Sequence, residues 1–415
     1  MAGIFYIQER SAQFSVYLLL QLFSIFWCTF LFLFTGLFDQ ICLLILLFFA
    51  PALSFFRLLP RIRIRNKLTG GVHVKKGATL TIPAGTTISA NYEEDIPYLL
   101  IEQGAKIDAQ GTAENPIIMT SDEKKEGAWG GLHICGYAHT NNSGNTVSEI
   151  GNAPYGGNND EDNSGILRYV RLEYTGKALD EEHEANGVSF YGVGNGTTVE
   201  YLQAYKGSDD GFEFFGGSVN VKHMVVTSCS DDSFDWTEGW NGKAQFLVAY
   251  QENKESLGYD CDCLMECDNN GNNFGASPVA HPVIANATLI GNGGSKQGVR
   301  LRAGTQVELY NILITGKDKP LTVETAETEN ALVNGDSKLE YVALNKVLES
   351  GEGLYTNEMF SQATGNLTNQ TFSWSNLYVG TVDGGKDLSA DKFFTPTDFK
   401  GAVQAGNDWT AGWTL

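Results

Sequence analysis

Six carboxylates gather in two short segments of the chain that repeat each other. The segment Val199–Phe214 aligns with Val221–Trp236 at an offset of 22 residues. The aligned carboxylates are Asp209, Asp210 and Glu213 in the first segment and Asp231, Asp232 and Asp235 in the second. Carboxylates this close together raise one another's pKa or recruit a cation. Such clusters are typical of acid–base catalytic sites and of calcium sites.

Three interpretations of this acidic repeat are open from the sequence. The Asp-Asp pairs suit turns in which the side chains cap their own backbone, repeated because the coil repeats. They also suit a calcium site, with Asp209, Asp210, Asp231 and Asp232 as its ligands. Finally, two of the six carboxylates would serve as acid and base in an enzyme that cleaves polysaccharides. We assign no catalytic residue, and we favour a binding protein over an enzyme.

A ligand-binding column is expected beside the acidic pairs. Residues that flank an inward aromatic point outward from a strand, so Glu213 and Asp235 should stand one above the other, about 4.8 Å apart. Two weaker echoes of the repeat put Ser189 and Arg300 at the same position. The residues expected to contact a ligand are Glu213, Asp235, Trp236, Trp240 and Arg300. The two tryptophans suit either stacking on sugar rings or a place in the core.

Arg300 and Arg302 invite comparison with lyases that pair calcium-binding aspartates with an arginine base. Such a role requires Arg300 to face the acidic column, and the same spacing suits a simple outward salt bridge. No motif of those lyases matches this chain residue by residue, so their sites are not carried over.

Other clusters of potential ligands have simpler interpretations. Cys261 and Cys263 share one face of an extended strand and are expected in the buried stack, with Cys267 on a neighbouring rung. No second ligand pair lies at the spacing that a zinc site needs. The Asn-rich segments 158–163 and 268–273 are expected to be solvated insertions, although such segments could also wrap calcium.

The elements that carry these residues are short strands joined by glycine turns. In the segment 72–88, apolar residues alternate with polar ones, and Gly77 and Gly85 interrupt the pattern. A repeat near 22 residues cannot bury its apolar face alone, so it must stack on its neighbours. No sustained helical periodicity follows residue 70. The prediction is therefore an all-β fold, a right-handed parallel β-helix.

Composition limits the classes of partner. Residues 1–67 hold six basic and two acidic side chains, a net charge of +4. Since the whole chain has a net charge of −21, the residues after Lys67 carry −25. Nucleic acid is not an expected partner, because no cluster of Lys and Arg follows Lys67. Seven cysteines in 415 residues are too few for a disulfide framework.

The N-terminal segment differs from the rest. Residues 11–38 are uncharged and long enough to span a bilayer, and 40–56 form a second, marginal stretch. We therefore expect residues 1–69 to be a hydrophobic segment with one or two transmembrane helices, or an atypical or misassigned start. Residues 70–345 are expected to form the β-helix, and 346–415 its C-terminal coils and cap.

Four segments carry a resemblance to a known family: 104–121, 127–132, 209–217 and 408–413. They resemble uncharacterised exported β-helix proteins of Bacteroidetes type. The resemblance covers about residues 70–415 and implies a pectin-lyase-like fold at the cell envelope or surface. Members of that family usually begin with a lipoprotein signal, which the apolar head of this chain does not match.

These observations lead to one expected function and two alternatives. We expect a membrane-associated protein whose exported body binds a glycan or another surface ligand along its acidic flank, with calcium as the candidate cofactor. The first alternative is a polysaccharide lyase or glycoside hydrolase that uses the carboxylate column. The second is a purely structural surface protein.

Overall fold

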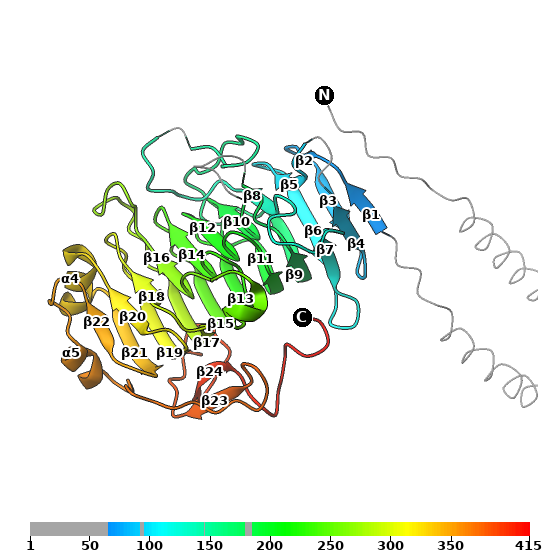
Figure 1. Ribbon diagram of the computed structural model, residues 1–415. Coiled ribbons are helices and arrows are strands. Elements are labelled where there is room, and N and C mark those ends of the chain that lie inside the picture. Colours follow the sequence, from blue (N-terminus) through cyan, green and yellow to red (C-terminus); the bar gives the residue numbers. More distant parts are fainter. Residues whose placement is uncertain (1–64, 92–94, 145, 179–184) are drawn as a thin grey trace, which may run out of the picture. The chain divides into compact units, whose positions relative to one another are not determined.

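Two parallel sheets enclose one apolar core in the computed structural model, which describes residues 65–91, 95–144, 146–178 and 185–415 (Figure 1). Successive strands alternate between the sheets over most of this length, so each turn of the chain adds one strand to each sheet. The described residues therefore form a parallel β-solenoid, as the 22-residue repeat predicts.

The first sheet, here called the long-strand sheet, has twelve strands among the described residues. They are β1 (Arg65–Leu68), β3 (Thr79–Ile82), β4 (Thr87–Ala90), β6 (Lys106–Gln110), β7 (Ile117–Thr120), β9 (Gly165–Glu173), β11 (Thr198–Tyr205), β13 (Asn220–Thr227), β15 (Lys243–Tyr250), β17 (Val283–Ile290), β19 (Glu308–Thr315) and β21 (Lys338–Leu344).

The second sheet, the short-strand sheet, has ten strands in the same part of the chain. They are β2 (Gly71–Val74), β5 (Tyr98–Ile101), β8 (Leu132–Cys135), β10 (Val188–Tyr191), β12 (Phe212–Phe215), β14 (Phe234–Thr237), β16 (Met265–Cys267), β18 (Gln297–Leu301), β20 (Lys319–Val323) and β22 (Leu348–Ser350). Among the described residues, three short helices lie in the connections: α3 (Lys254–Leu257), α4 (Ala326–Asn334) and α5 (Asn357–Gln362).

The strand register confirms the repeat. Val199 pairs with Val221 between β11 and β13, and Phe212 pairs with Phe234 between β12 and β14. The predicted turns at Gly77 and Gly85 are also present, with φ of 84° and 76°. Side chains with a Cβ rarely adopt this left-handed conformation, which explains glycine at these two turns.

Each long strand from β9 onward bends at one left-handed residue, and these residues form a ladder on the outside of the coil. Tyr201, His223 and Phe246 have φ between 56° and 62°. Their rings stack at centroid distances of 4.2 Å and 4.9 Å. The bend divides the strand into two parts, and the ladder offers an aromatic surface to the C-terminal segment.

The C-terminal stretch does not continue the coils in the expected way. Within 346–415, which the structure describes throughout, β22 is the last strand of the solenoid, and β23 (Gly380–Asp383) and β24 (Phe399–Val403) form an antiparallel pair. This segment returns along the long-strand sheet, where β24 contacts β15, β17 and β19 (Figure 1). Trp413 ends the return, buried against the aromatic ladder and held by Arg171 Nη1, which donates to its carbonyl oxygen at 2.8 Å.

The solenoid also begins earlier than expected. Strand β1 starts at Arg65 and pairs in parallel with β4, so residues 65–68 belong to the β-helix and not to the hydrophobic segment. The predicted transmembrane stretches within 1–64 lie outside the described residues. In the described part of the chain, no helix has the length and apolar character needed to cross a bilayer.

Candidate functional site

An outward column of side chains crosses the short-strand sheet. Strands β10, β12, β14, β16 and β18 place Ser189, Glu213, Asp235, Glu266 and Arg300 on successive rungs. The two predicted carboxylates, Glu213 and Asp235, are partly buried and retain contact with solvent. The inward-aromatic, outward-acid alternation expected from the sequence is therefore the one observed.

Glu266 is a member of this column that the 22-residue repeat does not reveal. The connection from Asp235 to Glu266 contains β15 and α3, and its greater length breaks the period. A signal is nevertheless present in β16, where partly buried Glu266 lies between buried Met265 and Cys267. The sequence interpretation treated this stretch as part of a cysteine cluster, which hid the alternation.

The second aspartate of each pair binds the next coil and not its own turn. Asp210 Oδ1 accepts a hydrogen bond from the backbone N–H of Asp232 at 2.9 Å. Asp232 Oδ1 accepts one from the backbone N–H of Cys263 at 2.6 Å. The structure thus corrects the predicted capping partner, because adjacent rungs lie close enough for a side chain to reach across. Asp210 and Asp232, which are 6% and 5% exposed, tie neighbouring coils together.

The carboxylates of the column crowd one another. Oxygen atoms of Asp210, Glu213 and Asp235 lie within 4.8 Å of one another, and so do those of Asp232, Asp235 and Glu266. Burial raises the pKa of Asp210, Glu213, Asp232 and Asp235 well above the ordinary value, and the neighbouring carboxylates raise it further. These four side chains therefore hold protons at pH values where a solvated carboxylate is ionised.

The four predicted calcium ligands do not form one cluster. Carboxylate oxygens of Asp209, Asp210 and Asp231 lie within 4.8 Å of one another, whereas Asp232 groups with side chains of β14 and β16. Asp232 accepts a hydrogen bond from the Cys263 N–H, which explains its separation from the other three aspartates. Calcium prefers six to eight oxygen ligands, so the three remaining carboxylates would need water or a ligand to complete the shell.

Arg300 faces the acidic column but is already paired. Its Nη1 lies 2.8 Å from Glu266 Oε1, and its Nη2 lies 3.1 Å from Glu324 Oε2. Arg302 Nη2 holds the other oxygen of Glu266 at 2.6 Å. Burial by itself lowers the pKa of Arg300, but the bonds to Glu324 and Glu266 outweigh it and raise that pKa. A base must lose its proton, so this geometry matches the outward salt bridge and opposes the lyase role.

The two tryptophans lie inside the coil, which corrects their expected role in ligand contact. Trp236 and Trp240 are each 1% exposed and belong to the apolar core. Trp236 Nε1 donates to Thr305 Oγ1 at 3.0 Å, and Trp240 Nε1 donates to the Val219 carbonyl at 3.2 Å. Trp236 lies on β14 next to outward Asp235, and Trp240 lies in the turn that follows the strand. Both rings face the core, so no sugar can stack on them. Of the two sequence interpretations, the core position is the observed one.

The cysteines behave as small core residues. Cys261, Cys263 and Cys267 are buried, and all five cysteines of the described residues are free thiols. Cys267 ends β16 on the same coil as Cys261 and Cys263, which corrects the neighbouring rung predicted for it, and it stands in register with Trp236 and Leu301. Burial raises the pKa of Cys261 to about 12, so this thiol stays protonated near neutral pH.

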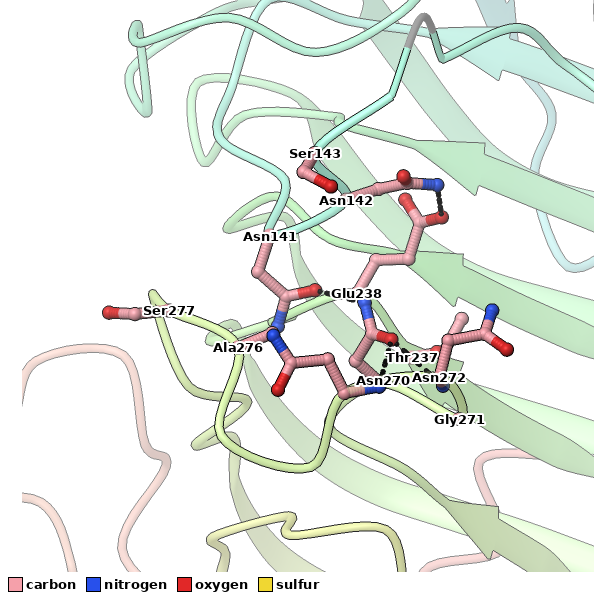
Figure 2. Close-up of a pocket in the computed structure, with 11 residues that line it drawn as sticks. Asn141, Asn142, Ser143, Thr237, Glu238, Asn270, Gly271, Asn272, Ala276 and Ser277 are labelled. Atoms are coloured by element: carbon pink, nitrogen blue, oxygen red, sulfur yellow. Dashed lines mark hydrogen bonds between the residues drawn. The ribbon is translucent and has the colours of Figure 1, made fainter.

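A cleft of about 460 Å³ opens at the C-terminal end of β14 (Figure 2). Its walls are residues 141–143 and part of the Asn-rich connection 270–277, and Thr237 and Glu238 lie between them. The segment 268–273, predicted to be a solvated insertion, contributes to a cleft with the distant residues 141–143, and the sequence pattern carries no distance between the two. The cleft adjoins the column, because Thr237 follows Asp235 by two residues on β14.

Comparison with known proteins identifies the family of this chain. A search of curated proteins finds no match to this chain. Residues 61–414 match the family described as the pectate-lyase like beta helix domain. This match covers the solenoid from its first strand through the returning C-terminal segment. The chain therefore belongs to the pectate-lyase like beta helix domain family.

Proposed function

We propose that this protein binds a glycan across the outer face of the short-strand sheet. The observation that carries the proposal is the continuity of this face, on which solvent-accessible Glu213, Asp235 and Glu266 lead to the cleft at Thr237. Carboxylates and amides are side chains that bond sugar hydroxyls, and an extended flank suits an extended polymer. Since the tryptophans are buried, recognition rests on hydrogen bonds and not on ring stacking.

The charge of the face selects among glycans. A polymer of uronic acids would bring more carboxylates against a column whose carboxylates already raise one another's pKa, which is unfavourable unless a cation lies between them. A neutral glycan meets no such penalty. We therefore infer that neutral polysaccharides bind without calcium, whereas acidic ones bind only when calcium occupies Asp209, Asp210 and Asp231.

A glycan array with and without calcium tests this proposal, followed by titration calorimetry on the polymers that bind. The double variant Glu213→Gln with Asp235→Asn should weaken polymer binding several-fold, because these two side chains line the proposed path. The matched control is Glu358→Gln, an exposed carboxylate on α5. Absence of binding to every glycan, in both conditions, would refute the proposal.

Cleavage of the bound glycan is a second candidate, favoured by one observation. Asp210, Glu213 and Asp235 lie within 4.8 Å of one another and two of them reach solvent, which is close to the spacing of about 5 Å in retaining glycosidases. The raised pKa of Glu213 suits a general acid. Reducing-end assays would detect hydrolysis, and ultraviolet absorbance of unsaturated products would detect a lyase. Release of products that Glu213→Gln abolishes would establish the enzyme.

The purely structural alternative has its own support in the coil-to-coil bonds of Asp210 and Asp232. If it holds for the whole column, neutral substitutions at Glu213 and Asp235 change stability alone and leave every glycan affinity untouched. The calorimetry described above therefore separates this alternative from the two others.

The location of the protein is a further part of the proposal. We propose that the β-helix is displayed at the cell envelope and tethered through the uncharged stretch 11–38. Protease treatment of intact cells should then degrade the β-helix, whereas protection in intact cells and digestion after lysis would place it inside.

A further inference from the structure

We propose that the cleft at the end of β14 is a recognition site for one neutral, hydroxyl-rich sugar unit, presented as a monosaccharide or as a unit of a longer glycan. The inference rests on the proposed function, since it names a subsite on the same face. The volume of about 460 Å³ falls within the range of about 300–1,000 Å³ that is usual for small-molecule sites.

The lining excludes several classes of ligand. Side chains of asparagine, serine and threonine line the cleft with one carboxylate, Glu238, and the residues that line it include no aromatic ring and no cation. An apolar ligand would find little surface to bury. A phosphate, sulfate or uronate would find no Lys or Arg and would face Glu238 as a like charge. A neutral polar ligand meets neither obstacle.

Two amide oxygens in the cleft are already engaged by the backbone. Asn142 Oδ1 accepts from the N–H of Gly144 at 3.1 Å, and Asn270 Oδ1 accepts from the N–H of Asn272 at 3.0 Å. These short-range bonds turn the oxygens toward their own loops. Each amide nitrogen carries two hydrogens. Asn142 Nδ2 and Asn270 Nδ2 each use one hydrogen, on Glu238 Oε1 and on Asn141 Oδ1, so each keeps one N–H for a ligand that offers oxygen acceptors.

Glu238 supplies the complementary acceptor. Its Oε2 accepts from Thr140 Oγ1 at 2.7 Å and from Tyr155 OH at 2.9 Å, and its Oε1 accepts from Asn142 Nδ2 at 2.8 Å. All three donors are neutral, so none of these bonds is an ion pair. A carboxylate oxygen can accept two hydrogen bonds, which leaves Oε1 one position for a sugar hydroxyl.

The two walls are held in place before any ligand arrives. Asn141 Nδ2 donates to Asn269 Oδ1 at 2.8 Å, and Asn270 Nδ2 donates back to Asn141 Oδ1 at 3.0 Å. Figure 2 shows Asn141 and Asn270 facing each other across this junction. Glu238 itself has a φ of 53°, a strained value for a residue with a side chain, and such strain persists where surrounding contacts fix it. The cleft is thus preorganised, which reduces the entropy cost of binding.

The test is calorimetry or saturation-transfer NMR with neutral methyl hexosides and methyl N-acetylhexosaminides, compared with the corresponding methyl uronides. The variant Asn272→Trp should fill the cleft and weaken binding of the neutral glycoside by about tenfold or more. It keeps the backbone N–H that bonds Asn270. Asn158→Trp, at an exposed position outside the cleft, is the matched control and should bind like the parent protein. Glu238→Gln should also weaken binding, by about fivefold.

The outcomes separate this inference from the proposed function. The cleft proposal is overturned if no neutral glycoside binds at millimolar concentration, if uronides bind as tightly, or if Asn272→Trp has no effect. Polymer binding that depends on Glu213 and Asp235 but not on Asn272 would overturn the cleft proposal and leave the proposed function standing. If the parent protein binds neither polymer nor monosaccharide, the cleft proposal and the proposed function are both refuted.

Discussion

Replacement of Glu213 by glutamine should stabilise the protein near neutral pH, although it removes a native side chain. The carboxylate lies within 4.8 Å of those of Asp210 and Asp235. Two unit charges at that distance repel by about 3 kcal/mol at an effective dielectric constant of about 20. Glutamine has the same shape and keeps an oxygen for Asn186 Nδ2, which donates to Glu213 at 2.5 Å.

Protonation limits the size of this gain. A carboxyl that must hold a proton above its ordinary pKa costs about 1.4 kcal/mol per pH unit, or at most about 4 kcal/mol at pH 7.5. We therefore expect Glu213→Gln to raise the free energy of unfolding by about 1–3 kcal/mol at pH 7.5. Because the folded pKa of Glu213 is raised, its stability contribution is complete below the unfolded pKa and is lost as pH rises toward the folded value. The gain should thus vanish near pH 4.

Urea denaturation of both proteins at pH 4.0 and pH 7.5 measures this difference. Glu266→Gln is the control on the same column, and it should destabilise the protein at pH 7.5 by about 1–3 kcal/mol. It loses the ion pairs of Glu266 with Arg300 and Arg302. Equal destabilisation by Glu213→Gln at both pH values would refute the electrostatic reasoning.

Three further predictions concern buried groups. Glu329→Gln should lower the free energy of unfolding by about 2–4 kcal/mol and speed hydrogen exchange at 352–355. The reason is that its buried carboxylate accepts hydrogen bonds from the backbone N–H groups of Glu352, Leu354 and Tyr355. Unchanged exchange would contradict this prediction. Trp236→Ala should cost about 3–5 kcal/mol yet keep glycan affinity in the folded protein, and calorimetry showing lost affinity would return the ring to the site. Burial raises the pKa of Cys135 and Cys229 to about 12, so thiol reagents at pH 8 should label them only after unfolding, as mass spectrometry would show.

The sequence alone determined the architecture and the register of its clearest rungs. A repeat of 22 residues with inward Phe212 and Phe234 leaves one way to stack, and the alternation of side chains along a strand then turns Glu213 and Asp235 outward. The same local rules placed Gly77 and Gly85 at left-handed turns. These features depend on residues that are close in the chain or on a constant repeat length, so the sequence alone predicts them.

The tertiary structure decided what surrounds those residues. The long connection between β14 and β16 places Glu266 in the column, where it forms an ion pair with Arg300. The aspartates cap the next coil because the winding of the coil brings its backbone within reach of their side chains. The cleft joins Asn141 to Asn269, 128 residues apart. A sequence pattern carries no distance between two irregular connections, so the pairing that forms the cleft depends on how the whole coil winds.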